Sequence, residues 1–177
     1  MQEGLFVAET PRYDSSGVID RINAIGKAVR ENGGIVVFIQ HDGPKGNLLE
    51  PGTDGWKLLS SLNRNSSDIV VNKTACDSFY KTDLAIVLET KKVKRLIVTG
   101  CATDFCVDTT VRAAFSLDYH IIVVADGHTT SDRPYVDAAS LIQHHNWLWG
   151  GLINPNSKIE VLKAENLVAR VSTVSDL

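Results

Sequence analysis

The stretch LIVTGCATDFCV at residues 96–107 holds the side chain with the most distinctive chemistry in this chain. Four apolar or β-branched residues, Leu96–Thr99, are typical of a buried strand, and Gly100 permits a turn after it. Apolar residues then recur at helical spacing, which predicts Cys106 in the first turn of a helix. Free backbone N–H groups and the helix dipole there favour a thiolate and stabilise an oxyanion. Cys106 is therefore a candidate nucleophile, the alternative being a buried, inert cysteine.

Lys73 is the second candidate, because it ends another strand-like run that begins at Asp68. In parallel sheets, ligands bind beyond the carboxyl ends of the strands, and both Lys73 and Cys106 are expected at such ends. A lysine close to a thiol stabilises the thiolate electrostatically. The alternative for Lys73 is a solvated lysine at a strand end.

The elements that must position these residues alternate along the chain. Helices are expected over residues 15–33, from about residue 83, after Cys106, and over residues 134–149. Strands are expected at residues 35–39, 68–73, 96–99 and 121–125, with an edge strand at 159–162. This order predicts an α/β fold: a three-layer, doubly wound, mostly parallel sheet with helices on both faces. The tail from Ala169 to Leu177 is expected to be loosely held.

Composition narrows the range of functions. A chain of 177 residues, 44% of them hydrophobic, is expected to form one domain over residues 1–177. The net charge is −3 and no basic stripe is present, which argues against nucleic acid or an anionic membrane as partner. No apolar run is long enough to span a bilayer. Three cysteines without a disulfide spacing fit a reducing compartment, so a cytoplasmic protein with a small-molecule substrate is expected.

With these residues in view, GCATDFCVDTT at residues 100–110 resembles the signature of the isochorismatase-like cysteine hydrolases, which include nicotinamidases and related amidases. The resemblance covers about residues 1–150. Further motifs occur in the family's order: MQEGLF at 1–6, Lys73 with Ser78-Phe79 after it, DGHTT at 126–130 and QHHN at 143–146. The resemblance implies that Cys106 and Lys73 are catalytic and that the backbone N–H groups of Ala102 and Cys106 form an oxyanion hole. It also implies a non-proline cis peptide bond at Cys101–Ala102.

The family's third catalytic residue, an aspartate, has no counterpart in this sequence. In the family it ends the first strand and stands just before a Met-Gln pair, which here is Met1-Gln2. Either the sequence begins at an internal methionine and about six to ten upstream residues, one strand's length, are left off, or this is a degenerate member. A sheet without its central strand exposes apolar faces and unpaired edges, so we expect the motif aspartate to precede Met1.

The implied reaction is attack of Cys106 on an amide or a similar carbonyl, release of the amine as a thioester forms, and hydrolysis by water. The namesake isochorismatases carry a glycine at the position of Cys106, so their vinyl-ether cleavage is not expected. Four aromatic residues, Phe6, Trp56, Phe79 and Phe105, are candidates for contact with substrate. Phe6 and Trp56 are favoured, and core packing is the alternative for each.

No metal and no cofactor are expected. Nicotinamidases hold a metal through an Asp-x-His pattern after the second strand, where this chain has Gln40-His41-Asp42. His41 and Asp42 would need a third ligand to hold a cation, so hydrogen bonds within the loop are expected instead. His144 and His145 are interpreted as structural, because adjacent helical residues point about 100° apart.

Two other functions remain open at this stage. A family member that has lost its aspartate could act as a small-molecule binder or interaction protein. A thiol redox sensor would use Cys101 and Cys106, although their spacing matches no standard redox motif. The resemblance further implies a homodimer or a larger homo-oligomer.

Overall fold

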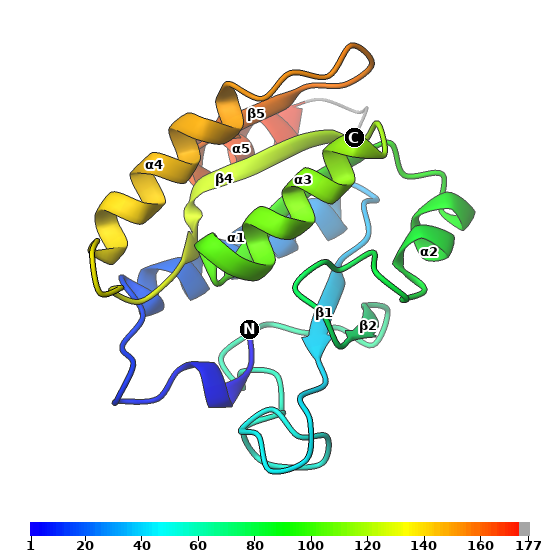
Figure 1. Cartoon of the computed structure of the whole chain (residues 1–177). Helices are drawn as coiled ribbons and strands as arrows, with labels where there is room; N and C mark the ends of the chain where they lie inside the picture. The colour runs from blue at the N-terminus through cyan, green and yellow to red at the C-terminus, as the bar shows by residue number, and fades with distance from the viewer. Residues whose placement is uncertain (174–177) are drawn as a thin grey trace.

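The strands of this protein form two parallel sheets, seen in a computed structural model that describes residues 1–173 (Figure 1). The first sheet pairs β1 (Val37–His41) with β2 (Ile69–Lys73). The second has the order β3 (Arg95–Cys101), β4 (His120–Thr129) and β5 (Ile159–Leu162). The predicted α/β class with parallel strands is confirmed, although β1 begins two residues later than expected and β4 continues as far as Thr129, the fourth residue of the DGHTT motif.

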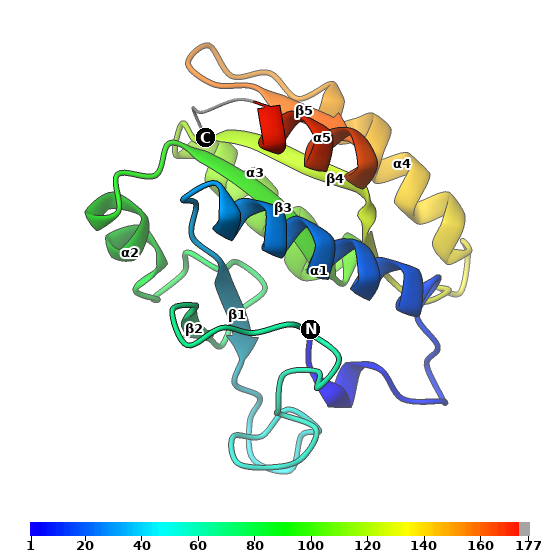
Figure 2. The same cartoon turned by 180° about the vertical axis from the view of Figure 1, so that it is seen from behind.

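Helices cover both faces of the larger sheet, as Figures 1 and 2 show from opposite sides. The helices are α1 (Ser15–Glu31) and α5 (Ala164–Thr173) on one face, and α3 (Asp108–Ser116) and α4 (Ala138–Gly150) on the other. The short helix α2 (Leu84–Thr90) packs against β2. Side chains alternate across β4, with Ile122 and Val124 toward α1 and α5, and Ile121 and Val123 toward α3 and α4. No helix within residues 1–173 has the length and hydropathy needed to cross a membrane.

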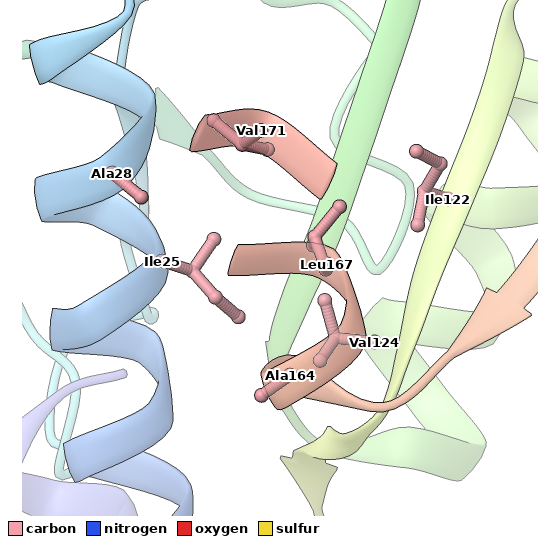
Figure 3. Close-up of a cluster of buried hydrophobic side chains, with 7 residues drawn as sticks. All are labelled: Ile25, Ala28, Ile122, Val124, Ala164, Leu167 and Val171. Atoms are coloured by element: carbon pink, nitrogen blue, oxygen red, sulfur yellow. The ribbon is translucent and has the colours of Figure 1, made fainter. Parts of the chain in front are cut away.

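The chain up to Val171 is more firmly packed than the sequence indicated. The expectation of a loosely held tail is wrong up to residue 173, because α5 runs from Ala164 to Thr173. Figure 3 shows Leu167 and Val171 of this helix directed toward Ile25 of α1 and toward β4. The spacing of Leu167 and Val171 places both on one helical face, which is fully buried. Residues 174–177 lie outside the described part of the chain.

A cavity separates the two sheets. Strands β1 and β3 share no hydrogen-bonded ladder. Between them lies a cavity of about 480 Å³, to which Val37 and Ile39 contribute from β1 and Val98 and Thr99 from β3. The family resemblance implies a central strand at this position.

Candidate active site

The cavity between the sheets brings together the residues that the sequence singled out for chemistry. Lys73, at the carboxyl end of β2, and Cys106, in the turn after β3, both line it, as does Ala102. The side chain of Lys73 is only 5% exposed, and its Nζ donates to the backbone oxygen of Cys76 at 2.5 Å. No carboxylate within residues 1–173 forms an ion pair with Lys73. The buried Lys73 and the candidate nucleophile Cys106 therefore line the same cavity.

Cys106 lies in a π-helical turn, Thr103–Val107, that leads into α3. The sequence predicts Cys106 in the first turn of a helix. In the structure this turn is π-helical, because the N–H of Val107 donates to the oxygen of Ala102 at 3.1 Å, five residues back. Ala102 and Cys106 both line the cavity, and the backbone N–H of Ala102, which lies between β3 and the π-helical turn, has no backbone acceptor among the turn and loop hydrogen bonds of the described chain. The bond between Cys101 and Ala102 is cis, as the resemblance implied.

A buried chain of hydrogen bonds connects this turn to β4 and α4. Thr103 Oγ1 lies 2.9 Å from His128 Nδ1, and His128 Nε2 lies 3.0 Å from Asn146 Oδ1. Burial lowers the pKa of His128 from 6.5 to about 4, so the imidazole is neutral at pH 7. The Asn146 amide donates to the oxygen of Ala125 at 2.9 Å, which leaves its Oδ1 to accept from Nε2–H of His128. Nδ1 of His128 then accepts from the Thr103 hydroxyl, and the turn is fixed to β4 and α4.

The motifs DGHTT and QHHN contain His128 and Asn146, but the sequence alone did not predict the hydrogen bond between them. His144 and His145 were interpreted as structural, and His145 Nδ1 lies 2.8 Å from the oxygen of Leu141 in its own helix. The side chain that reaches His128 is that of Asn146, the next residue along. The local sequence pattern gives no sign that Asn146, and not one of the two adjacent histidines, contacts β4.

A second network lies at the mouth of the cavity. Arg133 donates to Asp104 through Nε at 2.7 Å and Nη2 at 3.0 Å, and Thr130 Oγ1 donates to the same carboxylate at 2.6 Å. The Arg133 guanidinium lies over the ring of Phe105, 5.0 Å from its centre. Phe105 is 51% exposed and lines the cavity next to Cys106. The sequence favoured Phe6 and Trp56 over Phe105 as contact residues, whereas Phe105 is the one of these three that lines the cavity.

The two aromatic residues predicted to contact substrate do not line the cavity. Phe6 and Trp56 are both absent from its wall, to which Leu5 contributes instead. The indole Nε1 of Trp56 donates to Asp42 Oδ1 at 2.7 Å. This hydrogen bond stabilises the loop after β1, because a partly buried indole N–H is usually paired with an acceptor.

The expected hydrogen-bonding role fits Asp42 but not His41. Asp42 Oδ1 accepts from Trp56 and also from Asn72 Nδ2, at 2.8 Å. His41 lines the cavity, and its buried Nδ1 has no hydrogen-bond partner in the structure. Burial and then the charge of Lys73 lower the pKa of His41. Among residues 1–173, no group of three or more His, Cys, Asp and Glu side chains is arranged to hold a metal ion.

The three cysteines are free thiols with different surroundings. Burial raises the pKa of the Cys101 thiol, which disfavours its thiolate as a partner for disulfide exchange with Cys106. Burial likewise raises the pKa of Cys76, followed by interaction with the neighbouring Cys106 thiol. Of the three, only Cys106 lies in the π-helical turn after β3.

A family profile described as the isochorismatase domain matches residues 1–144. The chain belongs to the isochorismatase family. A crystal structure described as an isochorismatase family protein superposes with a TM-score of 0.82 at 30% identity and covers 90% of this chain and 92% of the other. A putative isochorismatase hydrolase from Oleispira antarctica gives a TM-score of 0.85 at 26% identity, over 95% of this chain and 91% of the other.

Relatives of this isochorismatase-family chain carry hydrolase names. A streptothricin hydrolase of Streptomyces noursei is 33% identical over 68% of this chain and 44% of its own length. The ureidoacrylate amidohydrolase RutB of Cronobacter sakazakii is 30% identical over 72% of this chain and 54% of its own length. The chain thus spans about half the length of these two relatives.

Proposed function

We propose that this isochorismatase-family chain is a cysteine hydrolase that cleaves the amide or a related C–N bond of a small molecule. The observation that carries the proposal is the position of Cys106: it lines the same cavity as Lys73 and Ala102, in the turn that leads into α3. The names of the relatives, an amidohydrolase and a streptothricin hydrolase, agree with a C–N bond as target.

In the proposed reaction, the Cys106 thiolate attacks the carbonyl carbon and the carbonyl oxygen becomes an oxyanion. The N–H groups of Ala102 and Cys106 bind that oxygen, and the ammonium of Lys73 stabilises the thiolate before attack. Collapse of the tetrahedral intermediate breaks the C–N bond, and the amine leaves with the proton that the thiol has lost. Water then attacks the thioester, releasing a carboxylic acid and restoring the thiol.

The proton transfers need a general acid–base group. No Asp or Glu within residues 1–173 lines the cavity. The resemblance gives this role to an aspartate that has no counterpart among these residues. A small molecule as partner, a cytoplasmic location, a homo-oligomeric state and the absence of a metal or cofactor remain predictions.

The test is amine or ammonia release from a panel of primary amides and ureido compounds. We expect Cys106→Ala to abolish release and to remove the site of rapid iodoacetamide labelling, read by mass spectrometry. The comparison variant is Cys76→Ala, the same chemical change at the neighbouring thiol of the cavity wall, which separates loss of the nucleophile from loss of a thiol in the cavity and should retain activity. Full activity in Cys106→Ala would overturn the proposal.

A non-catalytic small-molecule binder is the second candidate, favoured by the missing acidic side chain in the cavity wall. Calorimetry separates the two functions on the same panel. Binding heat without amine release in the protein with intact Cys106 would support the binder, whereas release that depends on Cys106 would support the hydrolase.

A further inference from the structure

Two of the three cysteines are neighbours in the wall of the cavity. Cys76 belongs to the irregular segment between β2 and α2, whereas Cys106 lies in the turn that leads into α3. Both line the cavity. Burial raises the pKa of the Cys76 thiol, and the charge of Cys106 and a hydrogen-bonding contact between the two thiols raise it further. The two sulfur atoms therefore lie next to each other, although the residues are far apart in the sequence.

Backbone contacts hold Cys76 in this position independently of its thiol. The oxygen of Cys76 accepts from Lys73 Nζ at 2.5 Å and lies 3.4 Å from Thr110 Oγ1. The N–H of Ser78 donates to the same hydroxyl at 3.2 Å. Thr110 follows Cys106 by four residues, a spacing that places both on one side of the helical segment. The segment that carries Cys76 is thus fixed to the side of α3 on which Cys106 lies.

Cys101 is less suited than Cys76 to react with Cys106. Burial raises the pKa of Cys101, and Cys106 affects this pKa through its charge and not through a contact between the thiols. Cys76 is exposed, so that oxidants and reductants in solution reach it. Proximity in the sequence pointed to Cys101 as the partner of Cys106, whereas packing brings Cys76 to it.

A second thiol beside a nucleophilic cysteine changes the outcome of oxidation. The first product on the nucleophile is a sulfenic acid, which condenses with a nearby thiol to form a disulfide. Without such a neighbour it is oxidised further to a sulfinic acid, which thiol reductants do not reverse. Cys106 is the candidate nucleophile, and Cys76 lies where a resolving thiol must lie.

We propose that Cys76 and Cys106 are a site of reversible oxidation, at which a hydroperoxide converts the two thiols into a disulfide. Formation of the disulfide does not require hydrolase activity. The loss of activity that it would cause, by blocking the sulfur of Cys106, rests on the proposed function.

The oxidation takes place in two steps. The Cys106 thiolate attacks one oxygen of the peroxide, so that an S–O bond forms, the O–O bond breaks and the other oxygen leaves as water or an alcohol once protonated. The Cys76 sulfur, losing its proton, then attacks the Cys106 sulfur: an S–S bond forms, the S–O bond breaks and water leaves. The two thiols lose two electrons and two protons in all, which the peroxide takes up. A dithiol reverses the oxidation by exchange and becomes a disulfide itself.

Mass spectrometry after treatment with hydrogen peroxide tests the proposal. The intact protein should lose the mass of two hydrogen atoms, and dithiothreitol should restore the original mass. Trypsin places Cys76 in the peptide of residues 74–81 and the other two cysteines in the peptide of residues 96–112. We expect the two peptides to be joined when no reductant is present. A disulfide within residues 96–112 would instead leave them separate and would contradict the proposal.

Three substitutions by serine identify the pair. In Cys101→Ser the cross-link should form as in the unsubstituted protein, and in Cys106→Ser it should be absent. In Cys76→Ser it should also be absent, and Cys106 should gain the mass of two oxygen atoms in excess peroxide, which dithiothreitol does not remove.

Activity provides a second readout. If the protein releases amine from an amide, peroxide should stop the release and dithiothreitol should restore it, whereas in Cys76→Ser the loss should be permanent. If the protein releases no amine before oxidation, the hydrolase proposal fails, but the cross-link is still measured by mass. Failures of the two proposals are therefore distinguishable.

Two results would overturn the proposed disulfide. One is absence of the cross-link both with peroxide and after equilibration with oxidised glutathione, which forms disulfides by exchange without a sulfenic acid. The other is a cross-link that persists in Cys106→Ser or disappears in Cys101→Ser, because either result assigns the bond to a different pair.

Discussion

The two sides of the molecule bury similar strand sequences to different depths. Ile121–Val124 of β4 are at most 1% exposed, whereas Val37–Ile39 of β1 all remain partly exposed. Strand β4 has a paired neighbour on each side and helices on both faces, while β1 is paired on one side only. Strand β3, also open toward the cavity, is likewise only partly buried up to Thr99. An apolar run thus predicts a strand, but its neighbours determine how deeply it is buried.

The largest expected effect is a difference in stability between two matched truncations. Ile122→Ala removes a side chain that is 1% exposed in β4, and we expect it to lower the free energy of unfolding by about 4 kcal/mol. Ile39→Ala makes the same change at the cavity and should cost about 1 kcal/mol, because less apolar surface is lost from the core. Urea unfolding measures both. Equal losses would contradict the comparison.

The smaller sheet should depend on one ion pair. Arg30 of α1 donates to Asp68 through Nε at 2.8 Å and Nη2 at 2.7 Å, just before β2 begins. The carboxylate of Asp68 is 2% exposed, so Arg30→Met leaves a buried charge unpaired and should cost about 3 kcal/mol. Amide exchange should accelerate in β1 and β2 more than in β4.

The control for that experiment restores an uncharged pair. Combining Arg30→Met with Asp68→Leu removes both charges and should recover most of the lost stability. A double variant no more stable than Arg30→Met would show that the two side chains contribute by packing and not as an ion pair.

Burial of His128 against the larger sheet should make the stability of the protein depend on pH. The pKa of His128 falls from 6.5 to about 4 on burial, so the unfolded chain binds more protons between these values. Stability should therefore fall by up to about 3 kcal/mol as the pH drops from 6.5 toward 4. Urea unfolding across this range measures the slope. His128→Gln should reduce it, whereas His144→Ala, at an exposed histidine, should leave it unchanged.

Much of the fold could be predicted because its signals are local. Apolar runs bounded by Gly and polar residues located β2, β4 and β5, and the alternation with helical patterns predicted the parallel sheets. The same pattern missed α5, because the tail was divided at Ala169, inside the helix. It also missed the π-helical turn, since the insertion of one residue into a helix leaves no periodic signal at that length.

The sequence by itself determined that Lys73 ends a strand and that Cys106 follows one. It also contained the family motif around Cys106. Only the tertiary structure decided which side chains face the cavity: Phe105 lines it, whereas Phe6 and Trp56 do not. It alone joined Thr103 to His128 and Asn146, residues 25 and 18 positions apart. Strand ends and helical periodicity depend on neighbouring residues, whereas hydrogen-bond partners across the sheet depend on how distant elements pack.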